Sequence, residues 1–134
     1  MRAVLDPNVI ISALLSPDGA PAQVLSAWRE GAFDLLVSPK LMAELRRALS
    51  YPKLQSRIEP QDSSELLDWL NRSAIHVADT HPPPVSSADP DDDYLIALAA
   101  GENAVLVSGD KHLLALANDA PVFAPRRFLE SLAA

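Results

Sequence analysis

The acidic residues of this chain have the types and spacing needed for divalent-metal chemistry. Four aspartates stand within five positions at the start of the segment DPDDDYLIALAA, which spans residues 89–100. Asp6 ends a short apolar run near the N-terminus, and Asp110 follows another such run, VLV. Carboxylate oxygens are the ligands that Mg²⁺ and Mn²⁺ prefer, and a chain without cysteine has no thiolate site. These acids therefore predict the metal-assisted chemistry of phosphoryl groups.

The segment after the acidic cluster predicts a buried helix over about residues 91–100. Asp91 and Asp92 favour helix N-terminal positions, where a carboxylate can accept hydrogen bonds from free backbone N–H groups. The remainder has no polar face, which indicates burial on nearly all sides. Asp93 shares a face with Ile96, because an α-helix has 3.6 residues per turn. A carboxylate on that face is costly to bury unless a cation meets it, so Asp93 is a candidate ligand.

Short apolar runs alternate with helical patterns along the whole chain. Ser38 and Pro39, for example, supply an N-cap and a first-turn proline. Strands alternating with helices imply parallel crossover units. We therefore expect one domain over residues 1–134, a three-layer α/β/α sandwich with a central parallel sheet of four to five strands. The expected strands are 3–5, 35–37, 75–77, 104–107 and 122–123; the expected helices are 8–15, 21–30, 39–49, 61–71, 91–100, 111–118 and 125–132, with 53–60 irregular and Gly101 as a C-terminal cap.

The candidate acids map to one edge of this expected sheet. Ligands of parallel sheets bind beyond the carboxyl ends of the strands. Asp6 and Asp110 lie just past two strands, and the helix headed by Asp93 leads into one of them. Glu44 lies at the edge of the apolar stripe of the helix that starts at Pro39. Each acid alone also fits a helix cap or a solvated surface charge, but like charges this close raise one another's pKa unless a divalent ion is present.

Composition bounds the function classes. The chain of 134 residues is 49% hydrophobic and 22% charged, which is ordinary for a soluble globular domain. No apolar run approaches the roughly 18 residues of a membrane span, and no signal-peptide pattern is present, which favours a cytoplasmic protein without a membrane partner. The net charge of −7 argues against broad electrostatic binding of nucleic acid. No Ser–His–Asp arrangement, Walker loop or glycine-rich fingerprint is visible.

Three segments resemble the signature segments of PIN-domain ribonucleases. They are VLDPNVIISALL, DPDDDYLIALA and VLVSGDKHLL, and they occur in the family's order. The likeness is greatest to the small bacterial PIN proteins that are toxins of VapBC-type toxin–antitoxin pairs. The family's catalytic acids, which hold the metal, correspond to Asp6, Glu44, Asp93 and Asp110. The residues that support them correspond to Asn8, Ser108, Asp91 and Asp92.

The resemblance implies a ribonuclease that uses one or two Mg²⁺ or Mn²⁺ ions and leaves a 5′-phosphate. It also implies a homodimer and a cognate antitoxin whose segment occludes the site. The apolar helix that starts at Asn8 fits such an interface, although plain core is the simpler interpretation. The basic residues that could contact an RNA backbone, each of which also fits a solvated surface charge, are Arg46, Arg47, Lys111, Arg126 and Arg127.

Other function classes stay open. A haloacid-dehalogenase-type phosphatase also begins with an aspartate after the first strand, but it needs a second aspartate where this chain has Asn8. A receiver domain needs an acceptor aspartate after the third strand, and none is visible. A PIN fold retained for binding RNA or protein is the stronger alternative. Pro7 stands where the family usually has a small residue, often threonine, and it removes a hydroxyl and a backbone N–H beside Asp6. Metal affinity without turnover would identify this alternative.

Overall fold

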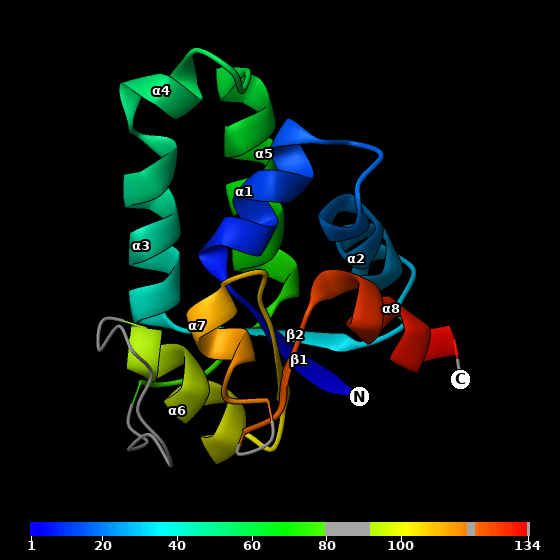
Figure 1. Cartoon of the computed structure of the whole chain (residues 1–134). Coiled ribbons are helices and arrows are strands. Elements are labelled where there is room, and N and C mark those ends of the chain that lie inside the picture. The colour runs from blue at the N-terminus through cyan, green and yellow to red at the C-terminus, as the bar shows by residue number, and fades with distance from the viewer. Residues whose placement is uncertain (80–91, 118–119, 134) are drawn as a thin grey trace.

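The computed structural model describes residues 1–79, 92–117 and 120–133 (Figure 1). Within these residues, five strands form one parallel sheet, as the sequence predicts. Their order, which the sequence analysis did not predict, is β3-β2-β1-β4-β5. The strands are short, and most residues of the three central strands are almost fully buried. Such burial is typical of a parallel sheet that is covered on both faces. They are β1 (Arg2–Leu5), β2 (Asp34–Val37), β3 (Ile75–His76), β4 (Val105–Val107) and β5 (Val122–Phe123).

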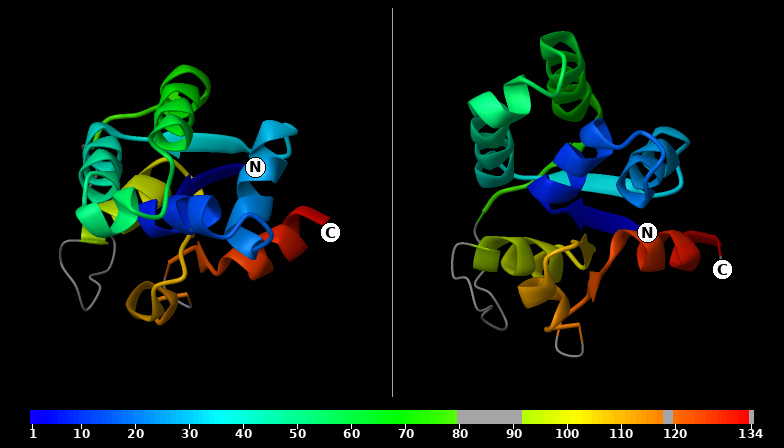
Figure 2. Two further views of the ribbon diagram at one scale, coloured as in Figure 1. Left: turned by 90° about the horizontal axis from the view of Figure 1, so that it is seen from above. Right: turned by 45° about the horizontal axis from the view of Figure 1, so that its top comes forward.

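The helices cover both faces of this sheet and complete the expected three-layer α/β/α sandwich. Helices α1 to α5 lie on one face, and α6 and α7 lie on the other (Figure 2). This division follows from right-handed crossovers, because the chain steps outward from β1 to β3 and then returns past β1 to β4 and β5. The helices are α1 (Pro7–Leu15), α2 (Ala20–Arg29), α3 (Pro39–Leu49), α4 (Pro52–Gln55), α5 (Pro60–Ser73), α6 (Asp93–Gly101), α7 (Lys111–Leu114) and α8 (Pro125–Ala133).

Helix α3 begins where the sequence predicts. The Ser38 side chain is fully buried and accepts a hydrogen bond from the Leu41 backbone N–H at 3.2 Å, with Pro39 in the first turn. The stripe that includes Leu41 and Leu45 is buried, and Glu44 lies half-buried at its edge. Because the Ser38 cap fixes where α3 begins, it also fixes the position of Glu44 relative to the sheet.

Several local predictions are wrong in detail. Part of the stretch predicted to be irregular forms the short helix α4, which has Pro52 at its first position. The helix predicted over residues 111–118 ends at Leu114, and residue 118 lies outside the described residues. Gly101 is the last residue of α6 rather than its cap, and the left-handed backbone that follows belongs to Asn103 (φ 57°). Asparagine tolerates this conformation because its short polar side chain can hydrogen-bond locally.

The buried side chains form one hydrophobic cluster around the sheet. Val9, Ile10 and Ala13 of α1 belong to it, so most of this helix is core, although Leu14 and Leu15 are only half-buried. In α6, residues 95–99 are buried, but Tyr94 is half-buried and Ala100 is exposed, so burial is less complete than the sequence predicts. Among the described residues, no helix has the length and apolarity to cross a membrane.

Candidate functional site

The candidate site lies where the strand order of the sheet reverses. β2 and β3 extend from one side of β1, whereas β4 and β5 extend from the other. In parallel sheets, ligands bind outside the carboxyl ends of the strands at this switch point. Leu5 pairs with Val107 at the ends of β1 and β4, so the residues that follow, Asp6 and Ser108, emerge side by side.

Asp6 is held on both carboxylate oxygens. Its Oδ1 accepts from the Asn8 backbone N–H at 3.0 Å, which caps α1, and its Oδ2 accepts from the Ser108 hydroxyl at 2.8 Å. The Ser108 Oγ in turn accepts from the Asp110 backbone N–H at 3.0 Å. Asn8 therefore supports Asp6 through its main chain. Pro7 is accommodated as the first residue of α1 without loss of this cap.

The environment of Asp6 disfavours its charged form. Burial is the largest cause and raises the pKa of this carboxyl above its ordinary value, because only 4% of the residue is exposed. The hydrogen bonds from Asn8 and Ser108 lower the pKa, and the charges of Asp110 and Glu44 raise it, with a net increase. Asp110 and Glu44, which the sequence predicts for the same site, thus both act on Asp6 through their charges.

Glu44 reaches this cluster from α3 and is held there by a residue of α6. The Tyr94 hydroxyl donates to the Glu44 Oε2 at 2.7 Å, and the Lys40 Nζ lies 4.7 Å from the centroid of the Tyr94 ring. Burial raises the pKa of Tyr94, and its hydrogen bond to Glu44 and the charges of Glu44, Asp6 and Asp92 raise it further. The sequence reasoning missed Tyr94 and Lys40. Two positions in the sequence could have indicated them: Tyr94 directly follows Asp93, and Lys40 stands one helical turn before Glu44.

The remaining predicted residues are placed as follows. Asp110 caps α7, and its Oδ1 accepts from the His112 backbone N–H at 2.8 Å. Asp93 is half-buried on the first turn of α6. Asp92 occupies the N-cap position of α6 without a side-chain capping bond, so the capping role predicted for it is not seen. Asp91 lies outside the described residues.

The donor chemistry of this cluster fits a hard divalent cation. Its ligand atoms are all carboxylate or hydroxyl oxygens, and a divalent cation would offset the burial and like-charge repulsion that raise the pKa of Asp6. Across residues 1–79, 92–117 and 120–133, however, no three histidine or acidic side chains stand as a ready metal site. Oxygens of Asp6, Asp110 and Glu44 accept hydrogen bonds in this arrangement, but each carboxylate has further lone pairs, so we expect these bonds to persist when small shifts bring the acids together around an ion.

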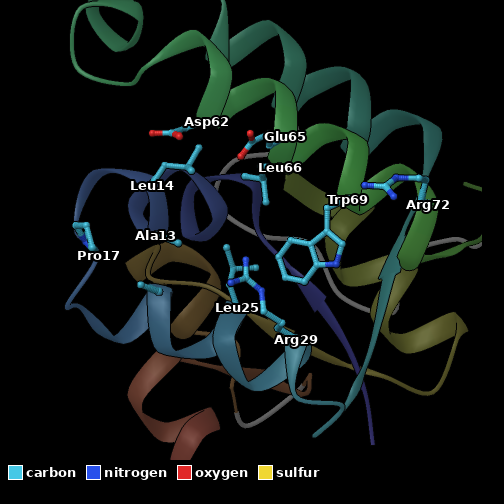
Figure 3. Close-up of a pocket in the computed structure, with 11 residues that line it drawn as sticks. Ala13, Leu14, Pro17, Leu25, Arg29, Asp62, Glu65, Leu66, Trp69 and Arg72 are labelled. Carbon is cyan, nitrogen blue, oxygen red and sulfur yellow. The ribbon is translucent and has the colours of Figure 1, made fainter.

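Two of the cavities formed by the described residues differ in whether they adjoin the candidate acids. One of about 320 Å³ adjoins Asp110 and is also lined by Asn8, Ser12 and Pro125. A larger one of about 590 Å³ lies between α1, α2 and α5, and its lining includes none of the candidate acids. Figure 3 shows this larger cavity. In it, the guanidinium carbon of Arg29 lies 4.7 Å from the centroid of the Trp69 ring. The smaller cavity is therefore the one next to the candidate chemistry.

Removing the Ser108 hydroxyl should destabilise the switch point. Ser108→Ala leaves a buried acceptor on Asp6 and the Asp110 N–H without their partner, at a cost of about 1–3 kcal/mol in the free energy of unfolding. Denaturant unfolding in a chelator measures this loss. Ser56→Ala removes an exposed hydroxyl and is the matched control, expected to stay within about 0.5 kcal/mol of wild type. Equal stability of the two variants would contradict the structural role of Ser108.

Comparison with known proteins settles the family. Residues 2–112 match the family model of the PIN domain. The chain belongs to the PIN domain family. PIN domains are nuclease domains, which agrees with the grouping of acids at the switch point of this one. The phosphatase and receiver interpretations are therefore set aside.

Relatives and solved structures place this PIN domain among small proteins of similar length. The uncharacterized protein MJ1680 of Methanocaldococcus jannaschii is 26% identical over 119 residues, which cover 89% of this chain and 77% of that protein. The structure of PAE2754 from Pyrobaculum aerophilum is 18% identical in sequence, with a TM-score of 0.65. The match covers 99% of this chain and 90% of that chain. A chain in the structure of VapBC2 from Rickettsia felis, solved with a DNA fragment from its promoter, is 15% identical in sequence, with a TM-score of 0.63. The match covers 92% of this chain and 98% of that chain. The structural likenesses, at these identities, show a shared fold.

Proposed function

We propose that this PIN domain is a ribonuclease that depends on Mg²⁺ or Mn²⁺ and hydrolyses phosphodiester bonds of RNA. The observation that carries this proposal is the buried Asp6, hydrogen-bonded to Ser108 at the switch point and acted on by the charges of Asp110 and Glu44. A site built from oxygen donors at the carboxyl edge of a parallel sheet suits metal-assisted phosphoryl chemistry.

Asp6, Asp93, Asp110 and Glu44 would hold one or two divalent ions. When bound, such an ion supplies Lewis acidity toward the phosphate and lowers the pKa of a water molecule. The chain's own residues orient the ligands: Ser108 and the Asn8 N–H fix both oxygens of Asp6, and Ser108 also fixes the start of the Asp110 turn. Asp91 and Asp92 are proposed as outer ligands.

A cavity beside the acids offers room for part of an RNA strand. The cavity next to Asp110 falls within the range of about 300–1,000 Å³ that is usual for small-ligand sites. Exposed basic side chains can contact phosphates and offset the chain's acidic net charge locally. Those that we propose are Lys40, Arg46, Arg47, Lys111, Arg126 and Arg127.

An RNA cleavage assay tests this proposal. Purified protein is incubated with single-stranded and structured RNA, and with DNA of the same sequence, in Mn²⁺, Mg²⁺ or chelator. We expect cleavage of RNA in either metal, none in chelator, and products that carry a 5′-phosphate. Cleavage that persists in chelator contradicts metal dependence. Metal binding without turnover would instead support the alternative of a PIN fold retained for binding RNA or protein.

We further propose that the protein is a homodimeric toxin whose activity a cognate antitoxin blocks. The fold that it shares with the VapBC2 structure supports this role, and so does the resemblance of its three signature segments to those of VapC-type toxins. Copurification of the chain with a small protein encoded beside it tests the partnership. The isolated chain should cleave RNA and the complex should not; equal activity of the two would contradict inhibition by that partner.

A further inference from the structure

The geometry points to Tyr94 as the positioning residue for Glu44: its hydroxyl holds one oxygen of Glu44 and so orients the other toward a bound metal ion. This inference rests on the proposed function, because it concerns the same metal site. Tyr94 does not need to touch the ion or the RNA. Its role is to fix the direction and restrict the motion of a longer ligand that comes from another layer of the fold.

The contact joins two helices on opposite faces of the sheet. Glu44 lies on α3 and Tyr94 on α6, and the start of α3 lies beside the start of α6 at the edge of the sheet (Figure 1). The hydrogen bond of 2.7 Å between them spans 50 residues of sequence. A glutamate has three side-chain torsions, so without this bond Glu44 can take many rotamers, and holding it in one lowers the cost of binding an ion.

Tyr94 is itself held in place from α3. The Lys40 Nζ lies 4.7 Å from the centroid of its ring, a cation–π distance, and Lys40 stands one turn before Glu44 on the same helix. The Lys40 backbone N–H donates to the Asp79 Oδ2 at 2.9 Å, which ties down the first turn of α3. Lys40 thus contacts the ring and Glu44 the hydroxyl, and the bond to Oε2 leaves Oε1 of Glu44 for a cation.

The simpler explanation is that the bond only pins α6 to α3. The two explanations differ in what Tyr94→Phe changes. This substitution keeps the ring and its contact with Lys40 but removes the hydroxyl. A purely structural bond predicts a modest loss of stability and unchanged metal affinity, whereas a positioning role predicts weaker metal binding. Loss of a hydrogen bond that orients a metal ligand typically lowers affinity by about 10- to 100-fold.

Mn²⁺ titration of the full chain by calorimetry distinguishes them. We expect Tyr94→Phe to weaken Mn²⁺ binding by about tenfold or more. Because the effect acts through Glu44, adding Tyr94→Phe to a Glu44→Gln chain should change the affinity by less than about twofold. The chain's other tyrosine provides a matched control: Tyr51 is 52% exposed at the start of α4, and Tyr51→Phe should leave the affinity unchanged. Thermal melts in chelator verify that each variant is folded.

A second readout is the metal dependence of RNA cleavage. The Mn²⁺ concentration for half-maximal cleavage should rise in Tyr94→Phe by the same factor as the dissociation constant, while the rate at saturating Mn²⁺ is retained. Unchanged Mn²⁺ affinity in folded Tyr94→Phe, when Asp6→Asn does lose Mn²⁺, overturns the inference and leaves the proposed function intact. Unchanged affinity in Glu44→Gln overturns it as well. If the wild-type chain binds no Mn²⁺, both the inference about Tyr94 and the proposed metal-dependent function are contradicted.

Discussion

Replacing Asp6 with asparagine is expected to lower metal-dependent RNA cleavage by roughly a thousandfold. The metal's contribution to such chemistry is worth several kcal/mol, and about 4 kcal/mol corresponds to a factor of about a thousand in rate. Asp6 is the most buried of the candidate acids that the structure describes, and both of its oxygens are held at the switch point. Its amide variant has nearly the same shape but no charge, so the loss should come from the chemistry. Initial cleavage rates at saturating Mn²⁺ measure the effect.

A matched control separates this loss from a general effect of removing a carboxylate. Asp62 is an exposed acid of α5, and Asp62→Asn makes the same chemical change away from the candidate acids. It should cleave RNA at the wild-type rate. Circular dichroism and thermal melts verify that both variants are folded. An Asp6→Asn chain that retains cleavage within about tenfold of wild type would show that Asp6 is not at the centre of the reaction.

Mg²⁺ or Mn²⁺ is expected to stabilise the wild-type protein at neutral pH and to lose this effect in acid. At a metal concentration one hundred times the dissociation constant, binding adds about 2.7 kcal/mol to the free energy of unfolding, or about 10 °C in melting temperature for a chain of this size. The ligands bind metal as carboxylates, so protonation of Asp6 competes with the ion. Because the folded-state pKa of Asp6 is raised, this competition begins at a higher pH than for an ordinary aspartate.

In chelator, the contribution of Asp6 has the opposite pH dependence. A carboxyl whose pKa is raised on folding favours the folded state below its unfolded pKa of about 3.9, and this stability is lost as pH rises through the folded pKa. Without metal, wild type should therefore lose stability relative to Asp6→Asn as pH rises from about 4 to neutral. Melts of both chains in Mn²⁺ and in chelator between pH 4 and 8 measure both trends. Equal metal stabilisation of Asp6→Asn at pH 7 would contradict a role for Asp6 in metal binding.

The sequence by itself determined the layout of the fold and most of the candidate site. Apolar runs separated by helical patterns predict a parallel sheet, because parallel strands need crossover connections. Ser38-Pro39 predicts the start of α3, because a capping hydroxyl and a first-turn proline act within a few residues of chain. Asp6 and Asp110 are predicted to share an edge because each lies at or just past the carboxyl end of a strand. These inferences depend on local periodicity and on the geometry of parallel sheets.

Only the tertiary structure decided how the acids are held. Ser108 donates to Asp6 across 102 residues of sequence, and Tyr94 donates to Glu44 across 50. Such partners depend on how β1 meets β4 and on how α3 and α6 approach each other from opposite faces of the sheet. The same packing makes Asp6 buried and raises its pKa. A local pattern specifies which face of an element is apolar, but the side chain that meets a given oxygen is fixed only when distant elements pack together.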